Sequence, residues 1–191
     1  MISIPEDGLL YHGSYVEVSK IDLSLCRDGL DFGKGFYLTS SLPQTIAYIP
    51  ALIRKAKRRG LVPKDAEETS AVVSVFEFHP APKLAIRHFE EPDSEWLHFV
   101  ASNRDANLFP ELRERYAKID VIVGKIANDQ TAVTLNNYLA GAYGKPGDKQ
   151  ADRIAVELLE PNRLKDQFCF RTDAAVASLR FVRNARYEYA R

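Results

Sequence analysis

Two tyrosines that follow a glycine-containing turn, Tyr37 and Tyr48, are well placed to hold a flat ring between them. The run Asp31-Phe-Gly-Lys-Gly-Phe-Tyr-Leu-Thr-Ser40 has two glycines, and glycine permits a bend or a close approach that a Cβ would block. Phe36–Thr39 then has the content of a short buried strand. Tyr37 would lie beside the turn and Tyr48 on the next helix, so both rings could face one pocket. A role as core aromatics, which most buried rings have, fits the pair equally well.

The elements around this pair follow from local signals. Ser41 is suited to cap a helix and Pro43 to its first turn, so the spacing predicts a helix over Gln44–Arg59. Pro50 should kink that helix or split it in two. Upstream, Leu9–Ser14 has the pattern of a strand that ends at a glycine, which would deliver His12 to a rim.

The rest of the chain alternates short strands with helices. Further strands are expected at Val72–Phe78, Leu84–Phe89, Asp120–Gly124, Leu164–Arg171 and Leu179–Val182. Val16–Leu30 is expected to be a loop, with a short strand around Val18–Ile21 as the alternative. Helices are expected at Ser94–Asn103, Glu111–Ala117, Thr131–Ala142 and Asp152–Leu159, and Thr172 should cap a helical turn. Gly33-Lys34-Gly35 precedes a strand, so it is not a phosphate-binding loop. We predict a single α+β domain spanning residues 1–191, built on small antiparallel sheets.

Composition limits the classes of function. Lys+Arg and Asp+Glu both number 26 in 191 residues, so the net charge is +0, which argues against a broad electrostatic grip on nucleic acid or membrane. The local run Arg54–Arg59 either complements its helix end or forms a basic rim for a phosphate-bearing partner. Two cysteines and no zinc-like spacing predict no disulfide scaffold and no metal site. Met1–Gly8 lacks the features of a signal peptide and no apolar run could span a bilayer, so a cytoplasmic location is expected.

An ordered set of motifs resembles the bacterial family DUF3990. The set comprises Leu10-Tyr-His-Gly-Ser14, Asp31-Phe-Gly-Lys-Gly-Phe-Tyr-Leu-Thr39, Val73-Ser-Val-Phe-Glu-Phe78, Trp96-Leu-His-Phe-Val-Ala-Ser-Asn-Arg104, Asp120-Val-Ile-Val-Gly124, Ala127-Asn-Asp129 and Leu164-Lys-Asp-Gln-Phe-Cys-Phe-Arg-Thr172. This family is grouped with the ADP-ribosyltransferase superfamily. The resemblance implies a split antiparallel β-sandwich with peripheral helices that clamps NAD⁺, used as a co-substrate.

The superfamily signature maps onto this sequence in three parts. His12 and Gly13 match the first part, Tyr37 matches the second, and Tyr48 falls on the spacing of a second tyrosine found in one branch. The third part is usually a glutamate, and Gln167 stands there. The implied NAD⁺-binding residues are His12, Gly13, Ser14, Gly35, Phe36, Tyr37 and Tyr48, and the implied catalytic residues are His12, Tyr37 and Gln167.

The resemblance also implies a role for each residue. The tyrosines would stack on the cationic nicotinamide, the Gly13 backbone would bind its carboxamide, and His12 and Ser14 would bind ribose hydroxyls. Gln167 leaves three alternatives open: it positions the ribose with weaker electrostatic help, a nearby acid such as Asp166 or Glu160 supplies the charge, or NAD⁺ is bound without turnover.

The expected activity is transfer of ADP-ribose from NAD⁺ to a macromolecule by a toxin-like mono-ADP-ribosyltransferase. Such an activity implies an antitoxin or immunity partner. The acceptor, protein or nucleic acid, is left undetermined by the sequence. An NAD⁺ glycohydrolase and a non-catalytic module that binds NAD⁺ or ADP-ribose are the alternatives.

Overall fold

One sheet of seven strands organises the part of the chain that the computed structural model describes, namely residues 8–64, 71–125, 129–159 and 166–187. The strands are β1 (Leu9–Ser14), β2 (Phe36–Thr39), β3 (Ala71–Phe78), β4 (Ile86–His88), β5 (Val121–Lys125), β6 (Asp166–Phe170) and β7 (Leu179–Tyr187). The helices are α1 (Leu42–Arg58), α2 (Ser94–Arg104), α3 (Pro110–Arg115), α4 (Asp129–Leu139), α5 (Lys149–Leu158) and α6 (Asp173–Val176), with a 3₁₀ turn, η1, at Leu23–Leu25.

The strand order across the sheet is β4-β5-β6-β2-β1-β3-β7. Every pairing is antiparallel except that of β4 with β5, which is parallel. The prediction of small, wholly antiparallel sheets is therefore wrong in this respect, because the described strands join in one mixed sheet. The α+β class is confirmed, with six α-helices in the described residues.

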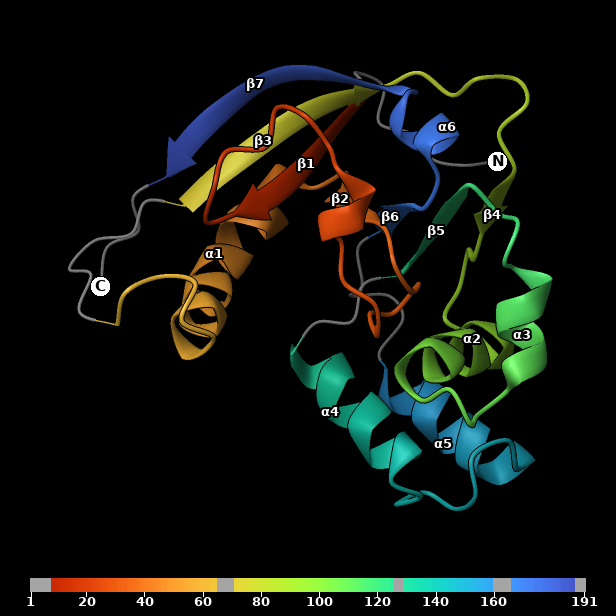
Figure 1. Ribbon diagram of the computed structural model, residues 1–191. Coiled ribbons are helices and arrows are strands. Elements are labelled where there is room, and N and C mark those ends of the chain that lie inside the picture. Colours follow the sequence, from red (N-terminus) through yellow and green to blue (C-terminus); the bar gives the residue numbers. More distant parts are fainter. Residues whose placement is uncertain (1–7, 65–70, 126–128, 160–165, 188–191) are drawn as a thin grey trace.

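The two central strands barely touch. β1 and β2 share one residue pair, Tyr11 opposite Thr39, whereas β1 pairs with β3 from Leu9 to Ser14. Figure 1 shows β1, β3 and β7 diverging from β6, β5 and β4. We call the place where β1 and β2 part the seam. It lies at the end of β1 and the start of β2, because the strands run antiparallel.

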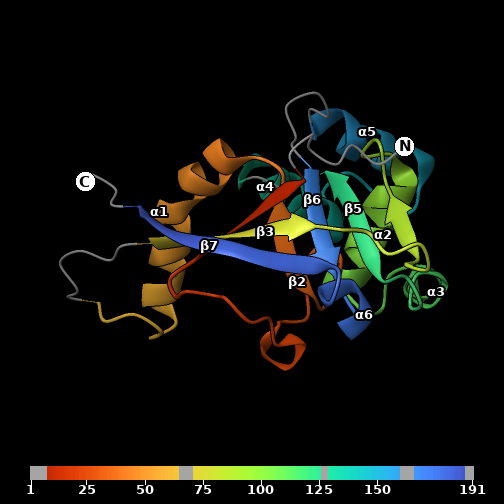
Figure 2. The same cartoon turned by 90° about the horizontal axis from the view of Figure 1, so that it is seen from above.

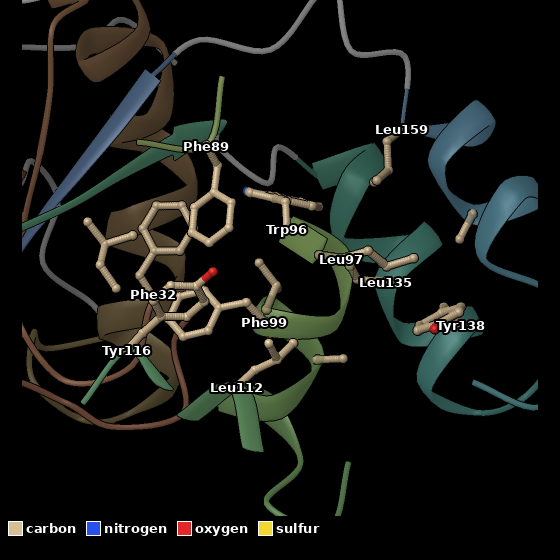
Figure 3. Packing of buried hydrophobic residues seen from close by; sticks show 14 of the residues in the cluster. Phe32, Phe89, Trp96, Leu97, Phe99, Leu112, Tyr116, Leu135, Tyr138 and Leu159 are labelled. Carbon is tan, nitrogen blue, oxygen red and sulfur yellow. The ribbon is translucent and has the colours of Figure 1, made fainter. Parts of the chain in front are cut away.

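Helices cover one face of the sheet in two groups. α2, α3, α4 and α5 pack below the β5–β6 half, and α1 packs below β1 and β3, as Figures 1 and 2 show from two directions. The larger group encloses a core of aromatic rings that includes Trp96, which is 0% exposed, and Phe99, which is 1% exposed (Figure 3). Both residues occupy the helix predicted for them.

The predicted bounds of β1 and two predicted helix caps are confirmed, since each depends on residues that are close in the sequence. β1 has the predicted bounds, the Ser41 hydroxyl accepts a hydrogen bond from the Gln44 amide at 3.3 Å, and the Thr172 hydroxyl accepts one from the Ala175 amide at 3.1 Å. The loop predicted for Val16–Leu30 is confirmed at Val18–Ile21, where no strand forms and Val18 and Ile21 pack against the core. α1 runs unbroken through Pro50.

Candidate functional site

His12 bridges the seam. Its Nδ1 lies 2.8 Å from the backbone carbonyl oxygen of Tyr37 on β2. A carbonyl only accepts hydrogen bonds, so Nδ1 carries the proton and donates it. The ring also lies 4.4 Å from the ring of Phe36, centroid to centroid. A side chain of β1 thus replaces the backbone pairing that the two strands lack here.

Burial fixes the charge state of the same ring. It lowers the pKa of His12, and the hydrogen bond with Tyr37 opposes the shift only in part. His12 is therefore neutral at pH 7. Because Nδ1 holds the proton, Nε2 presents a lone pair, and no described residue makes a recorded hydrogen bond to that atom. Nε2 is thus an acceptor that can receive a hydroxyl donor at the seam.

The Tyr37 hydroxyl holds the glycine turn that precedes its own strand. It donates to the Gly33 carbonyl at 2.6 Å and accepts from the Phe32 amide at 3.0 Å. Burial raises the pKa of this hydroxyl, so it stays protonated and donates. The ring lies 6.5 Å from that of Phe32, nearly parallel at 17°. Sequence reasoning assigned Tyr37 a ring-stacking role and missed its role in shaping the turn.

The end of α2 supports the same turn from outside. Arg104 binds the Asp31 carboxylate through Nε at 2.9 Å and Nη2 at 2.6 Å. The Asn103 side-chain amide donates to the Asp31 carbonyl at 3.2 Å. A two-pronged ion pair of this kind is geometrically specific. Asn103 and Arg104 therefore position the turn in this structure.

Gly35 and Phe36 pack where the chain enters β2. A Cβ on Gly35 would lie 2.5 Å from the Cys169 sulfur and 2.8 Å from the Phe170 carbonyl oxygen, so only glycine fits against β6. The Phe36 ring is buried and forms an edge contact with Phe76 at 5.5 Å. Burial raises the pKa of Cys169 to about 12, so its thiol stays protonated and is a poor nucleophile.

Gly13 and Tyr48 come together through α1. A Cβ on Gly13 would lie 3.0 Å from the Thr45 methyl carbon, so this helix packs directly on the end of β1. Tyr48 follows Thr45 by three positions and therefore shares its side of the helix. Thr45 is buried, whereas Tyr48 is 47% exposed. Tyr48 is thus accessible on this side of α1, and its predicted stacking role with Tyr37 stays a prediction.

Ser14 is committed to a local turn. Its side chain is buried, and its hydroxyl oxygen accepts a hydrogen bond from the Val16 amide at 3.2 Å. The hydroxyl proton is still available to a partner at the end of β1. The structure therefore leaves the ribose contact predicted for Ser14 as a prediction.

Gln167 lies on β6, opposite Thr39 of β2 and Gly124 of β5, at the end of β2 that is paired with β1 and not at the seam. Its side-chain carbonyl oxygen is buried and has no hydrogen-bond partner among the described residues. An unsatisfied buried oxygen costs about 1–3 kcal/mol. A donor on a ligand would remove that cost.

The acids proposed to substitute for a glutamate are differently placed. Asp166 binds the Lys125 ammonium at 3.1 Å, and both side chains are 20% exposed. Strand alternation also directs Asp166 to the other face from Gln167. Its charge is thus neutralised away from Gln167, while Glu160 lies outside the described residues.

The predicted residues do not share one face of the sheet. Tyr37 and Gln167 lie on the helix-covered face, with Gly13, whereas His12 and Phe36 lie on the opposite face. One hydrogen bond joins the two sets at the seam, from His12 to the Tyr37 carbonyl, whereas Gln167 lies at the other end of β2. His12 crosses the seam by donating a hydrogen bond from Nδ1 to the Tyr37 carbonyl oxygen.

A cavity of 660 Å³ opens on the outer side of the glycine turn. Its lining joins η1, the turn, α3 and the end of β6, with Lys34, Arg113 and Arg171 as its cations and Asp28 and Glu114 as its acids. Gly35 is the one predicted site residue that lines it. The other predicted site residues do not line this cavity.

A buried polar cluster that the sequence did not reveal joins three helices. His98 of α2 binds the Asp152 carboxylate of α5 at 2.8 Å, and the Tyr138 hydroxyl of α4 donates to the same carboxylate at 2.5 Å. The His98 ring stacks on Phe109 at 3.9 Å. No hydroxyl or thiol nucleophile is recorded in contact with His98, so the cluster is structural. Its residues are far apart in the sequence, so spacing gave no signal.

The described residues contain neither a metal-binding group nor a membrane-spanning helix. No group of three or more histidine, cysteine, aspartate and glutamate side chains within the described ranges could hold a metal ion. None of the helices in those ranges is both long enough and apolar enough to cross a membrane.

Fold and site together define an α+β protein whose mixed sheet parts between two central strands, with a neutral histidine bridging the opening. A family model matches residues 9–181: it is DUF3990, described as a protein of unknown function, and the chain belongs to this family. The family predicted from the sequence motifs is thus confirmed. No curated protein and no solved structure matched the chain.

Proposed function

We propose that this protein is a toxin-like, NAD⁺-dependent mono-ADP-ribosyltransferase that moves ADP-ribose to a macromolecule and releases nicotinamide. The observation that carries the proposal is the 2.8 Å contact of His12 with the Tyr37 carbonyl at the seam. This contact leaves Nε2 of His12 as a hydrogen-bond acceptor between β1 and β2, two strands whose residues match the superfamily signature. The parting of β1 and β2 supports an ADP-ribosyltransferase-like classification of the fold.

Binding would place the nicotinamide end of NAD⁺ at the seam. The exposed Tyr48 ring offers a face to the cationic nicotinamide, an attraction of about 1–2 kcal/mol. The backbone N–H and C=O of Gly13 would bind the carboxamide, as the family resemblance implies, while Thr45 of α1 fills the place of a Gly13 side chain. His12 Nε2 would accept a hydrogen bond from a ribose hydroxyl.

The reaction breaks the bond between the ribose carbon and the nicotinamide nitrogen. The bonding electrons leave with nicotinamide, which becomes neutral, and the ribosyl group develops oxocarbenium character. A nucleophilic atom of the acceptor then bonds to that carbon and loses its proton to solvent. The unpartnered oxygen of Gln167 supports a role in this step, since it can accept a hydrogen bond from the ribose and orient the reacting carbon.

The test uses NAD⁺ labelled on the adenylate, incubated with the purified protein with and without cell lysate. Free nicotinamide and labelled macromolecules are both followed. His12→Ala should abolish both signals, and His79→Ala is the matched control because His79 is an exposed histidine outside the seam. Equal activity in the two variants would overturn the assignment of the seam.

The glutamine itself favours a second candidate, a non-catalytic module that binds NAD⁺ or ADP-ribose. Gln167 brings no negative charge to a developing cation, so binding without turnover is consistent with it. Saturable NAD⁺ binding without release of nicotinamide would favour that candidate. Nicotinamide release without transferred label would instead favour an NAD⁺ glycohydrolase. A neutralising antitoxin or immunity protein is part of the transferase proposal, and toxicity on expression would support it.

A further inference from the structure

Cations gather on one side of the seam although the whole chain is neutral. Tyr48, Lys55 and Arg59 recur on one side of α1, because their spacings of seven and four residues each close whole turns. Lys55 and Arg59 are exposed. α1 rises about 1.5 Å per residue, so Lys55 lies about 10 Å along the helix from Tyr48.

Residues from two other segments join this side of α1. Lys55 interacts electrostatically with Arg59, with Arg27 of the loop after η1, and with Arg104 at the end of α2. Burial followed by these three cations lowers the pKa of Lys55, with Asp31 opposing the shift. We call Arg27, Lys55, Arg59 and Arg104 the basic face.

One carboxylate offsets part of this charge. Asp31 pairs with Arg104 at 2.6 Å, so that arginine is committed to the glycine turn. Asp28 follows Arg27 in the chain and accepts a hydrogen bond from the Gly29 amide. Within residues 8–64, 71–125, 129–159 and 166–187, Arg27, Lys55 and Arg59 form no ion pair, and Arg54 and Arg58 add exposed charge on the same helix.

The number of cations on the basic face distinguishes a polyanion from NAD⁺ as its ligand. The pyrophosphate of NAD⁺ carries two negative charges and its nicotinamide one positive charge, which one or two cations would match. Three cations without a recorded ion pair, flanked by two more, match the repeated phosphates of a polyanion. Phosphate contacts by lysine and arginine dominate the affinity of proteins for nucleic acid.

We propose that the basic face binds the phosphate backbone of a single-stranded nucleic acid, which is the acceptor. The proposal rests on the function assigned to the seam, since the basic face leads to it from Tyr48. The proposal takes a base as the acceptor group and therefore a single strand, because enzymes that modify bases need them outside the duplex. The basic face holds the strand, and the seam holds NAD⁺.

The test measures binding separately from chemistry. Binding of a fluorescent single strand of mixed sequence, made as DNA and as RNA, is followed by anisotropy over a range of salt concentrations. The triple variant Arg27→Gln/Lys55→Gln/Arg59→Gln leaves Arg104 on the turn. Each lost phosphate contact should reduce the slope of log K against log salt by about 0.7, so the slope should fall by about 2.

A control with the same loss of charge makes the test specific. Lys83→Gln/Lys118→Gln/Lys149→Gln removes three exposed cations that lie on other elements. This variant should keep most of the affinity and the slope. Equal losses in both variants, or no salt-dependent binding by the wild type, would overturn the proposal.

Nicotinamide release without nucleic acid distinguishes the remaining outcomes. It should be similar in the triple variant and the wild type, while labelling of the strand falls. A raised KM for NAD⁺ in the triple variant would assign the basic face to the dinucleotide and overturn the acceptor proposal. Strand binding with the expected slope but no reaction of NAD⁺ would overturn the function assigned to the seam and leave the nucleic-acid surface standing.

Discussion

The Nδ1 atom of His12 and the carbonyl oxygen of Tyr37 lie 2.8 Å apart across the opening between two central strands. This contact sets the orientation of the ring and the nitrogen that carries its proton. Burial lowers the pKa of the same ring, so the acceptor nitrogen persists at neutral pH.

NAD⁺ consumption should fall at acidic pH, because protonation of His12 removes its acceptor nitrogen. The folded-state pKa lies below the ordinary value of 6.5, so the seam loses its acceptor only as the pH falls through that lowered value. Stability should begin to fall at pH 6.5 and continue down to the lowered folded-state pKa, because in that window the unfolded chain binds a proton that the folded chain does not. A pH series of nicotinamide release and of urea unfolding checks both, and His12→Gln should flatten the stability profile. An unchanged profile would contradict the assignment.

Tyr37→Phe should loosen the glycine turn while it keeps the aromatic ring. It leaves the Phe32 amide and the Gly33 carbonyl without their partner, which should lower the free energy of unfolding by about 1–3 kcal/mol. Urea unfolding measures this loss. Tyr143→Phe is the control: the Tyr143 hydroxyl accepts one long hydrogen bond of 3.3 Å at an exposed site, so its loss should be under about 0.5 kcal/mol. Tyr37→Ala should in addition abolish NAD⁺ consumption.

Gln167→Ala should lower NAD⁺ consumption about 10-fold or more, the equivalent of one lost hydrogen bond to the reacting ribose. Asp166→Ala should leave the activity near that of the wild type, because Asp166 pairs with Lys125 on the other face of the sheet. Steady-state release of nicotinamide compares the two variants. The opposite ranking would move the electrostatic role from Gln167 to Asp166.

Asp152→Ala should lower the free energy of unfolding by about 3–5 kcal/mol, because it leaves His98 and the Tyr138 hydroxyl without their shared partner at a buried site. Asp148→Ala on the same helix is the control, since Asp148 makes no side-chain capping bond. Denaturant unfolding separates the two. At a temperature where Asp152→Ala remains folded, its NAD⁺ consumption should equal that of the wild type, and a selective loss would give the cluster a role beyond structure.

Sequence reasoning succeeded where near neighbours decide the structure. Ser41 and Thr172 cap their helices through atoms three residues away, and β1 needs only its own alternation and its glycine. It failed where distant partners decide. β7 extends to Tyr187, well past the predicted Val182, because β3 offers a partner along its whole length. Val18 lies in the predicted loop, and its amide binds the Ser74 hydroxyl.

The candidate site divides in the same way. The spacing of the motifs selected His12, Tyr37 and Gln167; the structure joins the first two by a hydrogen bond and places Gln167 at the other end of β2. The spacing of the motifs could not reveal that His12 lies on the opposite face of the sheet from Tyr37 and Gln167. Nor could it reveal that the Tyr37 hydroxyl donates to the Gly33 carbonyl. Both facts depend on the register of strands that are remote in sequence.

The single pair that joins β1 to β2 has a consequence for how the protein unfolds. The chain passes repeatedly from one half of the sheet to the other: β1, β3 and β7 form one half, and β2, β4, β5 and β6 the other. Neither half is a continuous segment, so neither can be cut out as an independently folding piece, and the two should melt cooperatively as one unit. A ligand that spans the gap would then add its binding free energy to the whole molecule, and a small molecule held at its weakest join would raise the melting temperature of every strand together.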